Sequence, residues 1–277
     1  MTVASSPSRV TEASRPADLV RQIAVISALC FMIIAAAVGT GAFGGTSVQN
    51  LQDGALDADG SFLAPARPAF SIWSAIYLLL IAYTVWQALP RQRAAARQRA
   101  VGWWVALTMV LNGLWLVTAQ FGTLALTVLM IFVLAAALSV TFQRTVAVPA
   151  ESVVDAVLID GTTGLHLGWV TLASVANTAA WLTASGFDVE APDAWGVAVL
   201  VVVAVIGVTF AVLSSGRFAP GLAIAWGLSW LAVGRLGGEP ASVAIGITAI
   251  VVAVVVIAAP IVLTVRRTGR GGRWFRP

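Results

Sequence analysis

Residues 70–90 read FSIWSAIYLLLIAYTVWQALP and predict one membrane-spanning helix. The stretch contains no charged residue, and its length matches the roughly 20 residues that a helix needs to cross the hydrocarbon core of a bilayer. Trp73 and Tyr77 lie four residues apart, so a helix places both rings on one face, one turn from each other. The sequence therefore predicts a membrane helix that carries an aromatic stripe.

The composition of the whole chain is that of a membrane protein with several spans. Hydrophobic residues make up 59% of the 277 residues, charged residues only 10%, and the mean hydropathy is +0.93; soluble domains carry roughly 25% charged residues. All 16 basic residues are arginines, and most lie beside apolar stretches, which indicates topology and lipid contact rather than nucleic-acid binding. Cys30 is the only cysteine, which excludes an intramolecular disulfide and a cysteine metal site.

Apolar stretches divide the chain into eight expected spans. They predict an all-α polytopic membrane protein with helices at residues 19–43, 70–89, 101–119, 123–142, 154–182, 195–213, 221–233 and 241–265. Residues 1–18 are rich in Ser, Thr, Pro and Arg and predict a disordered cytoplasmic tail. Arg21 precedes the first apolar run, so a cleaved signal peptide is the competing interpretation of that span.

The arginines predict the orientation in the membrane. With eight spans and a cytoplasmic amino terminus, 14 of the 16 arginines fall in cytoplasmic segments, which include the loop RQRAAARQR at residues 91–99 and a basic tail at residues 266–277. Only Arg67 and Arg235 fall in outward loops. Because arginines favour the cytoplasmic side, both termini are expected there. The absence of lysine beside abundant Ala, Val and Arg favours a bacterial source, and hence the plasma membrane of a bacterium.

The expected span at residues 154–182 is the longest and the least apolar. At 100° per residue, one stripe about 80° wide holds Asp155, Thr162, His166, Trp169, Ala173 and Asn177. An Asp at the centre of a membrane helix costs about 2.5–3.5 kcal/mol, so this stripe is expected to face the bundle interior or a cavity. Asp160 lies about 120° from His166 and is expected to face a different neighbour.

Three tryptophans are expected to converge in the outward half of the bundle. Asn112 and Trp115 share one face of their span, and Trp73 and Trp169 lie in the outward halves of theirs. If these spans pack together, the indoles enclose a cavity suited to a flat, polarisable and largely apolar ligand. The alternatives are an interfacial aromatic belt for the tryptophans and interhelical hydrogen bonds for Asn112 and Asn177.

Several motifs follow one another in a characteristic order: WSAIY at residues 73–77, NGLW at residues 112–115, and LGWVT at residues 167–171 with Asn177 eight residues after Trp169. This order resembles the translocator protein family, also called tryptophan-rich sensory protein (TspO/MBR) or peripheral benzodiazepine receptor. The resemblance covers residues 19–182 and implies a five-helix TspO-like bundle. Three additional transmembrane helices at residues 183–265 are expected to lie outside the family unit.

The resemblance implies binding of tetrapyrroles such as protoporphyrin IX or haem, for sensing, regulation or transport in a stress response. No cofactor is required, and the expected partners are membrane lipid and a small apolar planar ligand, without nucleic acid. Some family members resemble enzymes in degrading porphyrin under light, a role that would fall to Trp73 and Trp169. The ligand site it implies comprises Trp73, Tyr77, Asn112, Trp115, His166, Trp169, Ala173 and Asn177.

His166 is the only histidine and stands where the family has tyrosine. It is expected to be a buried core histidine bonded to a carbonyl or to Thr162; the alternative is a haem ligand, since neutral imidazole can bind iron. No other metal ligand is expected.

Two other classes of function stay open. Asp155, Asp160 and His166 would form a proton relay in a secondary transporter of a small lipophilic or anionic solute, although no inverted repeat is visible. The three C-terminal spans would alternatively belong to a membrane scaffold without ligand chemistry. Three small residues, Gly161, Gly164 and Gly168, would allow close helix contact, either within the five-helix unit or at a homodimer face.

Overall fold

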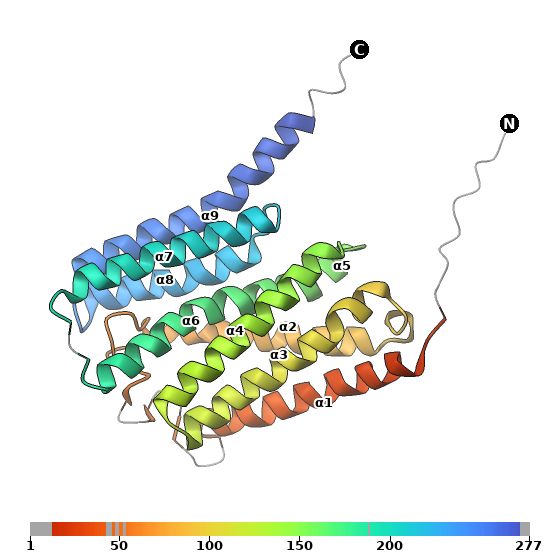
Figure 1. Cartoon of the computed structure of the whole chain (residues 1–277), viewed down its shortest axis with the longest axis horizontal. Coiled ribbons are helices and arrows are strands. Elements are labelled where there is room, and N and C mark those ends of the chain that lie inside the picture. Colours follow the sequence, from red (N-terminus) through yellow and green to blue (C-terminus); the bar gives the residue numbers. More distant parts are fainter. Residues whose placement is uncertain (1–12, 43–45, 48–49, 52–53, 188, 272–277) are drawn as a thin grey trace.

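A computed structural model describes residues 13–42, 46–47, 50–51, 54–187 and 189–271 as one helical bundle (Figure 1). In this part of the chain the long helices are α1 (Pro16–Gly39), α2 (Ile72–Ala88), α3 (Ala96–Phe121), α4 (Leu124–Ala147), α6 (Thr162–Ala184), α7 (Pro192–Leu213), α8 (Ala219–Gly237) and α9 (Val243–Gly271). Shorter elements are the 3₁₀ helices η3 (Arg67–Ser71) and η4 (Pro90–Gln92), the single turn α5 (Val153–Asp155) and the π-helix η5 (Ala156–Gly161).

The eight expected spans match the eight long helices, with α5, η5 and α6 together forming the fifth. Within the described residues, six helices are long and apolar enough to cross a membrane by length and composition; α6 and α8 are the less apolar pair. α1 begins and α9 ends at the same end of the bundle, as an even number of spans requires (Figure 1). The protein is therefore a polytopic α-helical membrane protein.

Local sequence explains where several helices start. The Thr123 hydroxyl accepts a hydrogen bond from the Leu126 N–H at 3.3 Å and caps α4. The Ser152 hydroxyl accepts one from the Asp155 N–H at 3.1 Å at the start of the fifth span. Pro192 occupies the first position of α7, where the missing N–H has no helical partner to lose. At each of these helix starts, the side chain either accepts a hydrogen bond from a backbone N–H that has no helical partner or, in proline, removes that N–H.

Some boundaries differ from the expected ones because charged residues at the helix ends have partners. α1 begins at Pro16, so the expected disordered tail does not extend to residue 18: Asp18 accepts hydrogen bonds from the Arg99 guanidinium at 2.6 and 2.8 Å. Arg97 lies in α3 rather than in a loop. Arg235, expected in an outward loop, lies in the last turn of α8 and is only 1% exposed.

The tails expected at the two ends of the chain fall mainly outside the described residues. Residues 1–12 and 272–277 are not described. At the carboxyl end α9 continues to Gly271, so the first residues of the expected basic tail are helical.

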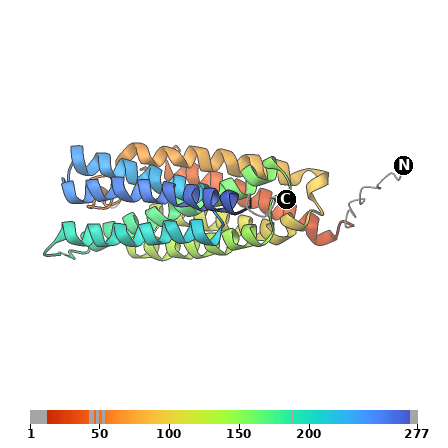
Figure 2. The ribbon, with the colours of Figure 1, turned by 90° about the horizontal axis from the view of Figure 1, so that it is seen from above.

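The helices pack as two groups joined by α6 and α8. In the first group α1 packs on α3, α3 on α4 and α4 on α6, and α2 contacts α1 and α6; in the second group α9 packs on both α8 and α7. Figure 2 shows the long helices of both groups running along one common direction. We call the end where α1 begins and α9 ends the arginine end, and the opposite end the loop end.

Two glycines explain how closely α6 approaches α8. A Cβ atom on Gly164 would lie 2.6 Å from the Cβ of Ala219, and one on Gly168 would lie 2.9 Å from the carbonyl carbon of Pro220. Gly161, by contrast, has room for a side chain. Gly164 and Gly168 therefore make close helix contact, but their partner is α8, which lies outside the five-helix unit in which such a contact was expected.

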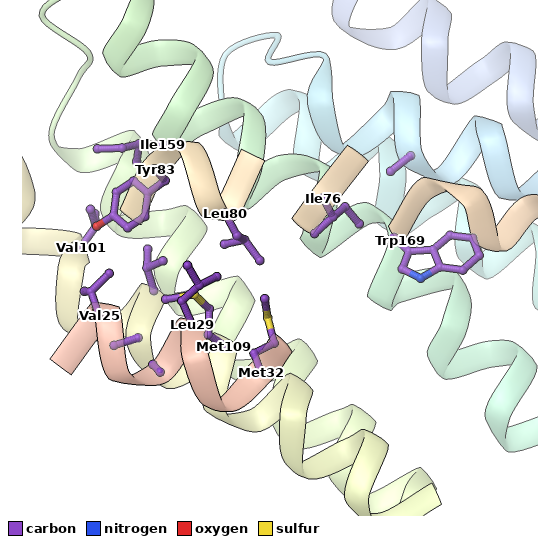
Figure 3. Packing of buried hydrophobic residues seen from close by; sticks show 14 of the residues in the cluster. Val25, Leu29, Met32, Ile76, Leu80, Tyr83, Val101, Met109, Ile159 and Trp169 are labelled. Atoms are coloured by element: carbon purple, nitrogen blue, oxygen red, sulfur yellow. The ribbon is translucent and has the colours of Figure 1, made fainter. Parts of the chain in front are cut away.

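The interior of the first group is filled by apolar side chains from α1, α2 and α3 (Figure 3). Met32, Ile76, Leu80 and Met109 are at most 1% exposed. Trp169 of α6 belongs to the same cluster. Because protein interiors are close-packed, this cluster gives the aromatic residues of α2 and α6 a rigid backing.

The π-helix changes the phase of the fifth span. One turn of a π-helix holds more residues than an α-helical turn, so residues five apart share a face. Asp155 and Asp160 therefore both reach the Arg97 guanidinium: Nη1 lies 2.9 Å from Asp155 Oδ1, and Nη2 pairs with Asp160. Asp155 is 6% exposed and pairs with a residue of α3, so the expectation that it faces the bundle interior is confirmed, although the π-helix brings Asp160 to the same partner.

Candidate functional site

A cavity of about 490 Å³ lies among α1, α2, α3, α4 and α6 towards the loop end. Small-molecule sites typically measure about 300–1,000 Å³. Among the described residues, no Arg, Asp or Glu lines this cavity, and most lining residues are apolar or aromatic. We call residues 54–66 the roof loop; its contribution to the lining is Ala55, Leu56, Ala64 and Pro65.

The structure brings most of the expected ligand-site residues together. The lining of the cavity includes Trp73, Tyr77, Asn112, Trp115, Trp169, Ala173 and Asn177. The indoles from α2, α3 and α6 thus converge on one space. The remaining expected residue, His166, does not line the cavity and is treated separately below.

Aromatic rings form one wall of the cavity. The Trp73 and Trp169 centroids lie 6.1 Å apart with the rings nearly perpendicular, and Trp73 lies 5.4 Å from Tyr77. Trp169 is 2% exposed, so it is part of the interior and not of an interfacial belt. Phe70 also lines the cavity and meets Trp169 at 5.8 Å. Sequence reasoning missed Phe70, although its position three residues before Trp73 was an available signal.

The two buried amides each bridge two helices. Tyr77 Oη donates to Asn112 Oδ1 at 3.2 Å, which joins α2 to α3. Trp115 Nε1 donates to Asn177 Oδ1 at 3.4 Å, which joins α3 to α6. The prediction that these asparagines make interhelical hydrogen bonds is confirmed.

The same bonds leave donor groups unused beside the cavity. Asn112 Nδ2, Asn177 Nδ2 and Trp169 Nε1 have no hydrogen-bond partner within the described residues. All three side chains belong to residues at most 3% exposed that line the cavity. An unsatisfied buried donor costs about 1–3 kcal/mol, so a ligand acceptor that these buried groups reach by a small side-chain movement would gain a hydrogen bond.

His166 lies behind the aromatic wall. Its ring meets the Trp73 ring edge-on at 5.8 Å, and the residue is 1% exposed. With Tyr83 and Thr162 it surrounds a separate void of about 10 Å³. His166 Nε2 and Thr162 Oγ1 both lack a partner among the described residues, so the two do not bond to each other through Nε2. A ligand in the cavity would meet Trp73 first, and the geometry does not support His166 as a haem ligand.

The acidic residues of the fifth span form an ion cluster at the arginine end, away from the cavity lining. Asp160 pairs with Arg97 and also with Arg217, at 3.1 Å from Nη1. Arg217 Nη1 donates to the Thr145 hydroxyl at 2.6 Å. The cluster ties α3, α4 and η5 to the segment that joins α7 and α8. Asp160 is thus engaged by arginines, whereas His166 packs on Trp73, and the two expected members of a proton relay lie in different environments.

An ion pair links the roof loop to the start of η3. Arg67 Nε donates to Asp57 Oδ1 at 2.8 Å, and the same oxygen accepts the Ala58 N–H at 2.7 Å. The hydrogen bond from Arg67 holds the pKa of the Asp57 carboxyl below its ordinary value. Asp57 directly follows Leu56, which lines the cavity. The pair therefore restrains the roof loop where the loop meets the site.

Comparison with known proteins places the chain in one family. The sequence model of TSPO-like protein matches residues 21–262. The match continues past residue 182 and through α7 and α8 into α9, so the expectation that the last three helices lie outside the family was wrong. No curated protein and no solved structure matches the chain. On the extent of the family match, the chain belongs to the TSPO-like protein family.

Proposed function

We propose that the protein binds a tetrapyrrole, such as protoporphyrin IX, in the cavity between α2, α3 and α6. The observation that carries this proposal is a cavity of about 490 Å³ lined by three tryptophans and by residues that hold three buried donors without a partner among the described residues. Membership of the TSPO-like family supports the same ligand class. The proposed ligand is therefore planar, largely apolar and equipped with hydrogen-bond acceptors.

The walls suit the two parts of such a ligand. The faces and edges of Trp73, Trp115 and Trp169 offer polarisable apolar surface to a conjugated ring system. The amide groups of Asn112 and Asn177 offer N–H donors to carbonyl or carboxylate oxygens. Binding then exchanges unsatisfied donors for hydrogen bonds and buries apolar ligand surface at the same time.

We further propose that the protein lies in the plasma membrane of a bacterium with both termini in the cytoplasm. The arginines support this orientation, because 14 of the 16 fall on the cytoplasmic side when the amino terminus is placed there and the chain crosses the membrane eight times. Sensing or regulation in a stress response, rather than proton-coupled transport, is the proposed role, since the acidic cluster does not line the cavity.

Titration of the purified protein with protoporphyrin IX tests the proposal, with ligand absorbance and tryptophan emission as readouts. The variants are the double substitution Trp73→Phe/Trp169→Phe and the matched control Trp195→Phe, whose residue is 62% exposed on α7. We expect saturable micromolar binding by wild type and control, weakened about tenfold or more in the double variant. Linear, unsaturable quenching in all three proteins would exclude the cavity as a tetrapyrrole site.

A further inference from the structure

The C-terminal helices contribute no residue to the lining of the cavity in the part of the chain that the structure describes. α8 nevertheless contacts two parts of its enclosure, the roof loop and the wall that carries Trp169. We propose that Arg235 of α8 is a positioning residue that holds the roof loop closed and so controls access to the cavity. The effect of Arg235 on ligand exchange rests on the proposed function, whereas its effect on access to the cavity is independent of what the protein binds.

The guanidinium of Arg235 binds the roof loop through backbone carbonyls. Nη2 donates to the Ala58 carbonyl at 2.8 Å and Nη1 to the Ser61 carbonyl at 3.2 Å. Nη2 also donates to the Glu239 carbonyl at 3.2 Å, just after α8 ends. A charged group buried at 1% exposure is costly unless hydrogen bonds satisfy it. The roof loop supplies two of these bonds, so loop and arginine depend on each other.

Two further hydrogen bonds join α8 to the end of the roof loop and to η3. The Ala66 N–H donates to the Trp230 carbonyl at 3.1 Å. Trp226 Nε1 donates to the Ala69 carbonyl at 2.9 Å. The cavity-lining residues Ala64 and Pro65 lie between these attachments and those of Arg235.

Apolar packing supports the same attachment. Leu63 of the roof loop is 8% exposed and belongs to one core cluster with Leu231 of α8 and Ile245 of α9. On the opposite wall, a Cβ atom on Gly227 would lie 3.2 Å from Cζ3 of Trp169. α8 therefore supports the indole wall directly and holds the loop that lines one side of the cavity. These contacts give the C-terminal helices a role within the chain rather than as a scaffold for another protein.

Cysteine labelling measures access to the cavity without any ligand. The background is the full chain with Cys30→Ser, because Cys30 is exposed, and with Ala173→Cys as a reporter on the cavity wall. Into this background go Arg235→Gln, Arg235→Lys and the control Arg91→Gln, whose residue is exposed at the arginine end. Trp226→Phe, which removes a single attachment, provides a variant that does not disturb a buried charge.

We expect Arg235→Gln to raise the rate of maleimide labelling about tenfold, the scale of a net loss of one hydrogen bond, because the glutamine amide keeps a donor for one of the two loop carbonyls. Arg235→Lys keeps the charge and some donors and should restore an intermediate rate, and Trp226→Phe should raise the rate about threefold. Hydrogen exchange should increase in residues 58–66 and stay unchanged in α2 and α6. A general loss of structure would instead accelerate exchange throughout the protein.

Ligand kinetics then test the consequence for function. Faster opening of the roof loop should raise the association and dissociation rates of protoporphyrin IX together, about tenfold in Arg235→Gln, with a much smaller change in Kd. Wild-type labelling rates in both Arg235→Gln and Trp226→Phe would overturn the proposal, whatever the protein binds. Absence of saturable protoporphyrin IX binding by the wild type would instead overturn the proposed function, while the labelling result would still decide the role of Arg235.

Discussion

Tyr77 Oη donates a hydrogen bond to Asn112 Oδ1 at 3.2 Å, so the oxygen of this amide has a partner within the protein. The Asn112 Nδ2 group is left without a partner within the described residues, beside a cavity that both side chains line. Trp115 and Asn177 repeat the arrangement between α3 and α6. In both pairs an aromatic donor engages the amide oxygen and leaves the buried amide N–H groups without a partner among the described residues.

Substitutions at this first pair should separate the two roles of the amide. Asn112→Leu removes the donor and should weaken protoporphyrin IX binding about tenfold, because ligand acceptors lose a buried partner. Tyr77→Phe keeps the donor and only frees the amide to rotate, so we expect a loss of about threefold. Equilibrium titration measures both, and unchanged affinity in Asn112→Leu would show that the amide does not contact the ligand.

The contact between α6 and α8 should tolerate no side chain at Gly168. Gly168→Ala places a Cβ atom against the Pro220 carbonyl and should lower the free energy of unfolding by about 1–3 kcal/mol through overpacking. Gly161→Ala is the matched control, because its Cβ would lie 3.8 Å from the nearest atom, the Ala156 carbonyl oxygen. Thermal unfolding in detergent should therefore distinguish the two variants. Equal melting temperatures would contradict the close packing described for these helices.

The ion cluster at the arginine end should contribute to stability and not to ligand binding. Asp160→Asn removes the carboxylate shared by Arg97 and Arg217 and should cost about 3 kcal/mol, the scale of breaking a buried pair. Protoporphyrin IX affinity should stay at the wild-type value. The control Asp59→Asn changes an exposed residue and should leave both quantities unchanged.

Transport assays in vesicles test whether the ion cluster has a role in proton-coupled transport instead. Proton-coupled solute uptake that disappears in Asp160→Asn, without loss of stability, would favour the transporter interpretation over the binding role proposed here.

The ion pair of the roof loop predicts how access to the cavity depends on pH. The pKa of Asp57 is held below its ordinary 3.8 by the hydrogen bond from Arg67. A lowered pKa means that the pair is intact above the ordinary Asp range and is lost as the pH falls through the lower, folded-state value. Labelling of Ala173→Cys in the Cys30→Ser background should therefore be flat between about pH 5 and 8, after correction for the reagent's own pH dependence.

A matched variant checks the assignment to this pair. Asp57→Asn should raise labelling modestly at neutral pH, because the Arg67 side chain is 62% exposed and such pairs contribute little, about 0–1 kcal/mol. Labelling that changes strongly between pH 5 and 8 would place the controlling group elsewhere.

The sequence predicts the helices and most of the cavity because both depend on regular α-helical spacing. From Trp169 to Asn177 the fifth span is an uninterrupted α-helix, and its residues line the cavity on the expected face. Regular spacing did not predict that Asp155 and Asp160 meet at Arg97, since the π-helix at Ala156–Gly161 shifts the phase of the span. Composition and hydropathy do not reveal that shift.

The contacts of α8 could not be read from the sequence for a different reason. The apolar stretch of the seventh span ends at Val233, which left Arg235 assigned to a loop, whereas hydrogen bonds to the roof loop allow the helix to continue to Gly237. These partners lie far away in the chain. A lone arginine beside an apolar span was the available signal, but its partners become visible only when the loop and the helix are placed together.

Protection of a cavity cysteine by ligand tests the central claim most directly. In the Cys30→Ser background, Ala173→Cys reports on the cavity wall and Ser229→Cys on an exposed face of α8. The account predicts that saturating protoporphyrin IX blocks maleimide labelling at position 173 and leaves labelling at position 229 unchanged. Equal labelling at position 173 with and without bound protoporphyrin IX would contradict the assignment of the indole-lined cavity as the ligand site.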